Sequence, residues 1–160
     1  MAATDLVSIA HYKHVPSDIL NTLADNLREA DRLEVWRLGR MKPRAALAMS
    51  AAMTPRTYVA SYGGEPISIF GVYHGALIGH GAPWMLATDK VMEMTDRLMS
   101  VSRRFIASAL TRHLILSNTV DDENRAAKLY LRRLGFTLEE PVLNMFGHPV
   151  RRFKMEATDV

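Results

Sequence analysis

The most constraining feature of this sequence is the stretch 113–136, HLILSNTVDDENRAAKLYLRRLGF. It opens with a short apolar run, Leu114–Leu116, which predicts a strand that is covered on both faces. The polar residues 118–124 that follow predict a loop. Asn124 can then cap a helix, because its side-chain oxygen can accept a hydrogen bond from a backbone N–H that the first turn leaves unpaired.

The helix predicted after Asn124 carries a single apolar stripe. Its members recur at helical spacing and are Ala127, Tyr130, Leu131 and Leu134. Gly135 follows directly, and a glycine ends a helix at low cost because it adopts a left-handed conformation without a Cβ clash. Phe136 then begins a new strand. The stretch therefore predicts the unit strand, loop, helix and strand.

The rest of the chain alternates between helical and strand patterns. We expect the order β-α-α-β-β-β-α-β-α-β-β, with no repeats or linkers, and therefore a single α+β domain over residues 1–160. After the stretch, residues from Val142 onward predict a strand pair with a turn at 147–149. Before it, the pattern predicts a strand at 6–12, helices at 18–38 and 43–53, strands at 57–62, 67–73 and 76–88, and a helix at 91–110.

Composition excludes several kinds of site. The chain has no cysteine, which excludes disulfides, thiol nucleophiles and thiolate metal ligands and fits a cytoplasmic protein. The histidines form no helical pair with a nearby carboxylate, so we expect no metal site. No apolar run reaches about 18 residues, so we expect no membrane span. The net charge of +3 is mild and favours an ordinary solvated surface over a nucleic-acid interface.

The order of elements and two short motifs resemble the GNAT acyltransferase superfamily. Asn124-Arg-Ala-Ala, followed by Leu134-Gly135-Phe136, is similar to that superfamily's N-x-A-A…G-F helix. Leu86-Ala87-Thr88-Asp89 is similar to the L-A-V-D-P end of its fourth strand. The resemblance implies a GNAT fold: a mixed, mostly antiparallel sheet of about six to seven strands, splayed between strands 4 and 5 and flanked by about four helices. Acetyl-CoA enters this split in the superfamily.

A narrower resemblance concerns two segments together. GAPWMLATD, followed later by SNTV…N…LRRLGF, is similar to a divergent GNAT-like family of tailed phages. Its members include acetyltransferase-like proteins and internal virion proteins. This resemblance implies a bacterial host cytoplasm or a virion as the location.

The superfamily resemblance also implies where acetyl-CoA would bind. The strand amides of Met85, Leu86 and Ala87 would pair with the pantetheine amides as a neighbouring strand would. The N-terminus of the next helix would face the pyrophosphate, with Lys90 assisting. Asn124 matches a position that often contacts the cofactor in the superfamily.

The sequence departs from the superfamily at three places. No glycine occurs between Gly81 and Gly135, so the usual glycine-containing pyrophosphate loop is missing. Leu131 occupies the position of the superfamily's acid tyrosine, and Tyr130 lies about 100° away around the helix. The superfamily often places a carboxylate on its fourth strand as general base. The strand expected at 76–88 holds no carboxylate, which leaves His80 as its titratable group.

Two functions therefore stay open. In the first, the protein transfers acetyl from acetyl-CoA to an amine of a small molecule or a host protein, with His80 as base and Tyr130 as acid, and it can form a homodimer. In the second, a catalytically degenerate phage protein acts in the virion or binds a host protein. Structural roles compete with both catalytic candidates, and Glu34 either orients an amine or lies on a solvated helix face.

Overall fold

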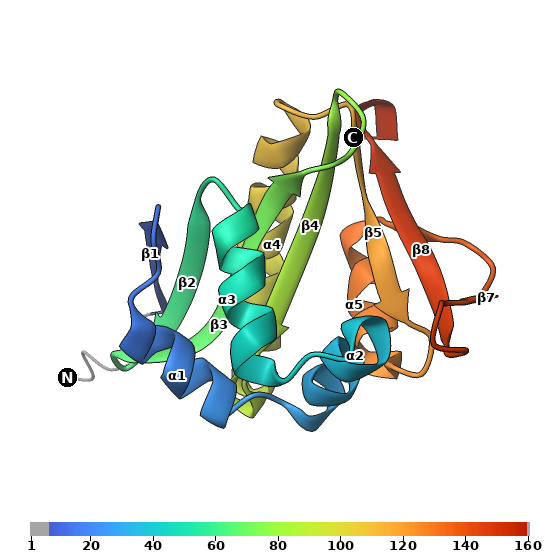
Figure 1. The fold of residues 1–160 in the computed structure, drawn as a ribbon. Helices are drawn as coiled ribbons and strands as arrows, with labels where there is room; N and C mark the ends of the chain where they lie inside the picture. Colours follow the sequence, from blue (N-terminus) through green and yellow to red (C-terminus); the bar gives the residue numbers. More distant parts are fainter. Residues whose placement is uncertain (1–6, 160) are drawn as a thin grey trace.

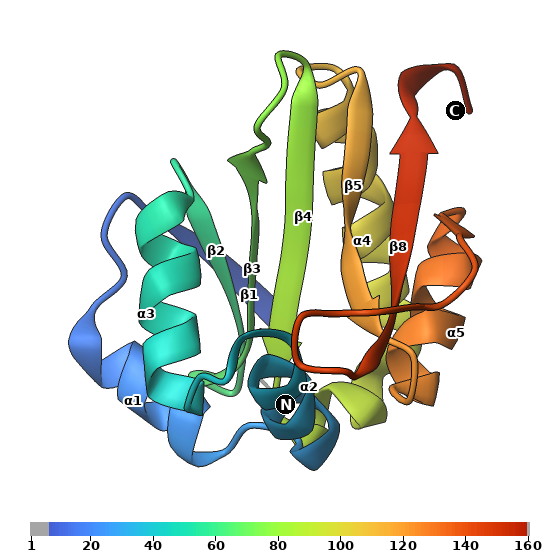
Figure 2. The same ribbon diagram turned by 45° about the vertical axis from the view of Figure 1, so that its right-hand side comes forward.

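The computed structural model describes residues 7–159 as one mixed sheet with helices on both faces (Figures 1 and 2). The eight strands are β1 Val7–Tyr12, β2 Thr57–Tyr62, β3 Glu65–His74, β4 His80–Ala87, β5 Ile115–Asp121, β6 Thr137–Leu138, β7 Val142–Leu143 and β8 Pro149–Glu156. Their order in space is β1-β2-β3-β4-β5-β8-β6, and β7 also pairs with β8. Every pair is antiparallel except β4 with β5. The predicted α+β class is confirmed, with one strand more than expected.

The described residues form five α-helices and two short 3₁₀ helices. These are α1 Ser17–Asp25, α2 Glu29–Gly39, α3 Pro43–Met53, η1 Asp89–Met94, α4 Thr95–Leu110, α5 Arg125–Leu134 and η2 Ala157–Asp159. Helices α1 and α3 cover one face of the sheet, and α4 and α5 cover the other (Figure 2). Helix α2 lies near the open end of the gap between β4 and β5 (Figures 1 and 2).

The sheet opens between β4 and β5. These strands pair only at the first two residues of β4, His80 and Gly81, and then diverge toward their C-terminal ends (Figure 1). The side-chain amide of Asn118 donates to the Pro83 carbonyl at 3.0 Å, just beyond the last paired residues. The expected splay between strands 4 and 5 is therefore confirmed. It divides the sheet into an N-terminal half-sheet, β1–β4, and a C-terminal half-sheet, β5–β8.

Each half-sheet has its own hydrophobic core. The N-terminal half-sheet packs on α1 and α3 through Leu23, Leu47 and Ile69, and its other face packs on η1 and the start of α4. The C-terminal half-sheet packs on α4 and α5 around Leu116 and Phe153. Helix α4 joins the two, because its first turns belong to the one core and its last turns to the other.

The prediction of one helix at 18–38 was wrong. The chain leaves the helical conformation after Asp25, and Leu27 forms an isolated β-bridge with Thr88. The Arg28 N–H then donates to the Ala87 carbonyl at 2.9 Å. These long-range bonds to the end of β4 break the helix, although the apolar spacing continues through it.

The boundaries of several other elements also differ from the predicted ones. The predicted loop at 118–124 is mostly strand, because β5 runs through Asp121 and pairs with β8 along its whole length. Leu114 precedes this strand and is 68% exposed. Strand β4 begins at His80 rather than at residue 76, and residues 89–94 form η1 before α4 begins. Leu6, predicted as the first strand residue, lies outside the described residues.

Helix α5 begins and ends where the sequence predicts. The Asn124 Oδ1 accepts the Ala127 N–H at 3.1 Å and caps α5. Gly135 closes the helix with φ of 104°, in the left-handed region. Its apolar stripe faces α4 and the C-terminal half-sheet.

Candidate active site

A cleft of about 830 Å³ occupies the opening between β4 and β5. Its walls come from α2, α3, β4, the η1–α4 segment, β5 and α5, together with residues 144–145. Most of the lining side chains are apolar, and methionine is frequent among them. The charged lining residues in the described part of the chain are Arg28, Asp31, Glu34 and Arg133. The cleft is therefore an apolar space with a few charges at defined places.

The edge of β4 that faces the split leaves one residue with both backbone groups free. Backbone groups alternate in direction along a strand, so Pro83, Met85 and Ala87 face the split. Pro83 has no N–H, and its carbonyl accepts the side-chain bond described above. The Ala87 N–H donates to Asp31 at 2.9 Å, and its carbonyl accepts from the Arg28 N–H. Met85 alone offers an unpaired N–H and an unpaired carbonyl to the cleft.

The other residues expected to bind cofactor lie differently. Leu86 lines the cleft with its side chain, while its backbone groups face β3, where it pairs with Ile69. Lys90 lies outside the cleft lining on η1, half exposed, 3.7 Å from Glu93. Asn124 is buried outside the lining, and its Nδ2 has no hydrogen-bond partner.

His80 lies at the closed end of the split. It pairs with Ile115 of β5, and its carbonyl accepts the Gly75 N–H at 2.8 Å. It is not among the cleft-lining residues. The structure therefore does not bring His80 together with Met85 and Tyr130.

Tyr130 lines the cleft from α5. Its hydroxyl is hydrogen-bonded to the Ser102 hydroxyl and lies 3.4 Å from the Leu98 carbonyl, both on α4. Burial raises the pKa of Tyr130, although the Ser102 hydrogen bond acts in the opposite direction. The phenol therefore stays protonated at neutral pH and can donate a proton. Leu131 lines the cleft beside it.

Asp31 fastens the start of α2 to the end of β4. Asp31 is 1% exposed, and its carboxylate accepts three guanidinium hydrogen bonds from Arg28, the shortest at 3.0 Å. The same carboxylate accepts the Ala87 N–H. Asp31 and Arg28 therefore neutralise each other within the cleft wall.

Glu34 is the cleft-lining carboxylate that has no ion-pair partner among the described residues. It lies one helical turn after Asp31, and its Oε1 accepts the Asp121 N–H at 2.9 Å. No Lys, Arg or His among residues 7–159 forms an ion pair with it. Burial raises the pKa of Glu34 from 4.5 to about 8, and the nearby carboxylates of Asp31 and Asp121 add to this effect.

The sequence carried a signal for this wall. Asp31, Glu34, Val35 and Leu38 recur at helical spacing and all line the cleft. The stripe mixes acidic with apolar residues, which a purely apolar search along the helix passes over. The solvated helix face considered for Glu34 was the wrong interpretation.

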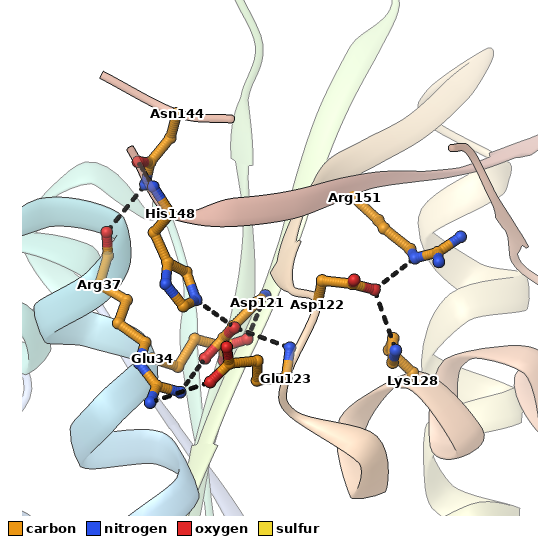
Figure 3. Close-up of polar contacts among 9 residues, drawn as sticks. All are labelled: Glu34, Arg37, Asp121, Asp122, Glu123, Lys128, Asn144, His148 and Arg151. Carbon is orange, nitrogen blue, oxygen red and sulfur yellow. Dashed lines mark hydrogen bonds and ion pairs between the residues drawn. The ribbon is translucent and has the colours of Figure 1, made fainter. Parts of the chain in front are cut away.

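A polar network at the end of β5 holds this wall in place (Figure 3). The Asp121 carboxylate accepts hydrogen bonds from Arg37 at 3.0 Å, from the His148 Nε2 at 2.7 Å and from the Glu123 N–H at 2.9 Å. Burial alone would raise the pKa of Asp121, but these three bonds outweigh it and lower the pKa below its ordinary value. The side chain of Asn144 also donates to the Arg37 carbonyl.

The network therefore joins α2 to β5 and to the loop before β8. On its far side, Asp122 pairs with Lys128 of α5 and with Arg151 of β8 (Figure 3). These bonds fix the C-terminal half-sheet and α2 relative to each other across the open end of the split.

Comparison with known proteins gives the fold. No protein-family model and no curated protein matches the sequence. Among solved structures, the aminoglycoside acetyltransferase AAC(6')-Ib in complex with coenzyme A is similar, with a TM-score of 0.66, 13% identity and coverage of 95% of this chain and 96% of that one. A GNAT-family acetyltransferase from Bacillus anthracis has a TM-score of 0.71 at 6% identity, covering 96% of this chain and 98% of that one. The AAC(6')-Ib complex with coenzyme A and kanamycin has a TM-score of 0.66 at 15% identity, with 95% and 96% covered. The protein therefore has the GNAT fold.

Proposed function

We propose that this protein transfers an acetyl group from acetyl-CoA to a primary amine. The observation that carries the proposal is the free backbone of Met85 at the split edge of β4. It opens onto a cleft that also holds the Glu34 carboxylate, which has no ion-pair partner among the described residues, and the Tyr130 phenol. The similar structures of the same fold described above are acetyltransferases, and two of them are complexes with coenzyme A. Their similarity supports the reaction class.

The reaction requires the amine nitrogen to attack the thioester carbonyl, so that a C–N bond forms and the C–S bond breaks. The Met85 N–H can donate to the carbonyl oxygen as that oxygen gains negative charge. The Tyr130 hydroxyl, held by Ser102, is our candidate for the proton that the leaving thiolate takes up. His80 is not part of this proposal, because it lies outside the cleft lining.

The fit to acetyl-CoA is better for the pantetheine arm than for the phosphates. Met85 and the apolar walls suit an extended amide-containing chain. The segment that would face the phosphates is η1, which has no glycine, and its Lys90 is paired with Glu93. We therefore propose that the affinity depends mainly on contacts within the cleft.

We propose an acceptor with one amine on an apolar body. Several methionines and Trp84 line the cleft. Next to lining residues of α2 and of the loop before β8, the Arg40 Cζ lies 5.3 Å from the centroid of the Trp36 ring and 4.8 Å from that of the Phe146 ring. Among the described lining residues, Glu34 is the carboxylate available for a cationic group, since Asp31 is paired with Arg28. A similar structure is a complex with kanamycin. One available carboxylate among the described lining residues suits a single amine better than a polycation.

Calorimetric titration with acetyl-CoA and a thiol-release assay with a panel of amines test the proposal. We expect binding at about 1 mM acetyl-CoA or below, and faster release with an arylalkylamine than with kanamycin. Absence of binding heat and of amine-dependent thiol release would overturn the proposed activity.

The second candidate function is a phage protein that has kept the fold and lost the reaction. The glycine-free η1 segment with its internal Lys90–Glu93 pair favours this candidate. Such a protein would act in the virion or bind a host protein in the bacterial cytoplasm. Its test is detection of the protein in purified virions together with absence of acetyl-CoA binding; acetyl transfer would exclude this candidate.

A further inference from the structure

We infer that Glu34 is the general base that takes the proton from the ammonium group of the acceptor, with Asp121 as the residue that positions it. This inference rests on the proposed acetyl transfer. It names a residue on α2, on the wall opposite α5, rather than one on β4.

The position of Glu34 in the cleft supports this assignment. Tyr130 and Glu34 come from α5 and α2, and the free backbone of Met85 comes from β4, so all three line one space from different walls. Since Asp31 is held by Arg28, Glu34 is the cleft carboxylate available to an ammonium group.

The Glu34 carboxylate is held through one of its two oxygens. The Asp121 N–H binds the Glu34 Oε1, whereas the Oε2 has no hydrogen-bond partner among the described residues. Asp121 is itself fixed by Arg37 and His148 (Figure 3). One oxygen thus anchors the side chain, and the other is free to accept a proton.

An ammonium ion cannot attack a thioester until it loses a proton. The Glu34 carboxylate takes this proton and becomes a carboxylic acid, and the neutral amine then forms the C–N bond. As the C–S bond breaks, the Tyr130 hydroxyl protonates the leaving thiolate, and the second amine proton restores the Tyr130 hydroxyl. Glu34 then returns its proton to water, so that the products are the amide, the free thiol and one proton.

The surroundings of Glu34 suit a base for an amine. The charged and titratable groups around it are Arg28, Asp31 and Arg37 from α2 and its start, Asp121 from β5, and His148 from the loop before β8. Strand β4 contributes no charged side chain to the cleft. Burial and the two acids raise the pKa of Glu34 to about 8. This pKa is closer to that of an alkylamine than the pKa of an ordinary carboxylate is.

The test compares Glu34→Gln with the wild type. Glutamine keeps the oxygen that accepts the Asp121 N–H but cannot take a proton. We expect kcat/KM for an alkylamine to fall about 10²- to 10⁴-fold, with acetyl-CoA affinity unchanged. With an alkoxyamine, which is already neutral at the assay pH, we expect a loss of less than about tenfold. The matched control is Glu29→Gln, an exposed residue of the same helix, which should keep the wild-type rate.

The outcomes separate the inference from the proposed function. If the wild type transfers acetyl to no amine, the proposed function fails and the base fails with it. If the wild type is active and Glu34→Gln loses equal factors with both acceptors, or loses nothing, the base assignment alone is overturned. The pH profile of the wild type gives a second test, which does not depend on whether a variant folds. The kcat/KM for the alkylamine should increase with pH through an ionisation near pH 8. A profile without this increase would overturn the assignment.

Discussion

On folding, the Glu34 carboxylate loses hydrogen bonds to water and gains one hydrogen bond from a backbone N–H, that of Asp121. Its ionised form is therefore less favourable in the folded chain than in the unfolded chain. The pKa of about 8 in the fold, against an ordinary 4.5, is the measure of this imbalance. The residue that we assign to catalysis is thus also one that weakens the fold when it is charged.

This imbalance makes stability depend on pH. The folded state binds the Glu34 proton more tightly, so the contribution of this group is complete below pH 4.5 and is lost as pH rises to about 8. We expect Glu34→Gln to remove this loss, so that the variant becomes more stable relative to the wild type between about pH 5 and pH 9. Urea unfolding at several pH values measures it. A constant difference between the two proteins across that range would contradict the raised pKa.

Asp31 differs from Glu34 in having the Arg28 guanidinium as an ion-pair partner, although burial still raises the pKa of Asp31. Removing it in Asp31→Ala leaves Arg28 and the Ala87 N–H without their partner in a buried place. We expect a loss of about 3 to 5 kcal/mol in the free energy of unfolding. Asp31→Asn keeps an oxygen for the Ala87 N–H and should lose less. Equal losses in the two variants would show that the backbone bond contributes nothing.

At this scale the sequence predicted what depends on near neighbours. The Asn124 cap and the Gly135 helix end follow from residues within one turn, and both were correct. The role of Glu34 depends on the Asp121 N–H, 87 positions away along the chain. No local pattern contains that information, although the mixed acidic and apolar stripe of α2 marks the face on which it lies.

Among the elements, the start of β4 is where side-chain volume matters most. Gly81 is one of the two β4 residues that pair with β5, and a Cβ there would lie 2.7 Å from the Val72 Cγ1 and 2.8 Å from the His113 ring. The close approach of β3, β4 and residue 113 therefore leaves no room for a methyl group.

We expect Gly81→Ala to destabilise the protein by about 1 to 3 kcal/mol, because the added methyl group must push these neighbours apart. The matched control is Gly39→Ala in the last position of α2, where the nearest atom would be 3.5 Å away. There, alanine should be neutral or slightly stabilising, since it favours a helix over glycine. Thermal unfolding of both variants checks this, and equal melting temperatures would contradict the close packing at Gly81.

Elements with strong local signals were predicted well, and those governed by distant partners were not. Helix α3 matched its predicted bounds, because Pro43 and Thr54 mark its ends. The break between α1 and α2 was missed, because bonds from Leu27 and Arg28 to the end of β4 decide it. The polar half of β5 was predicted as a loop, because its strand conformation comes from pairing with β8.

For the molecule as a whole, the contacts of Arg37 and Asn144 join parts that the split separates. Arg37 on α2 pairs with Asp121 and Glu123 beyond the opening, and its carbonyl accepts from Asn144. We expect Arg37→Met to lower the free energy of unfolding by about 2 to 4 kcal/mol, since it leaves the buried Asp121 without one of its charge partners. It should also raise hydrogen exchange in residues 144–148.

The matched control for this experiment is Arg104→Met, an exposed residue of α4. It should change neither stability nor exchange. If Arg37→Met behaved like this control, the contacts across the open end would have no structural importance.

The general plan of the molecule was predictable from the sequence. The order of elements and the resemblance gave the split sheet correctly. The strand predicted from Phe136 and the strand pair predicted around the turn at 147–149 correspond to β6, β7 and β8, although β6 and β7 are only two residues each. No helix in the described range 7–159 is long and apolar enough to cross a membrane, and no metal-ligating group of three side chains occurs there.

The brief pairing of β4 with β5 also bears on how the chain acquires its structure. Residues 20–98 supply the buried members of the two cores of the N-terminal half-sheet, and residues 106–155 supply those of the other. A ribosome therefore releases nearly everything that the first unit needs before β5 is made. We expect two cooperative folding units. The C-terminal unit should dock on α4 after the first turns of this helix have packed on the N-terminal half-sheet, and the pairing of β4 with β5 should form last.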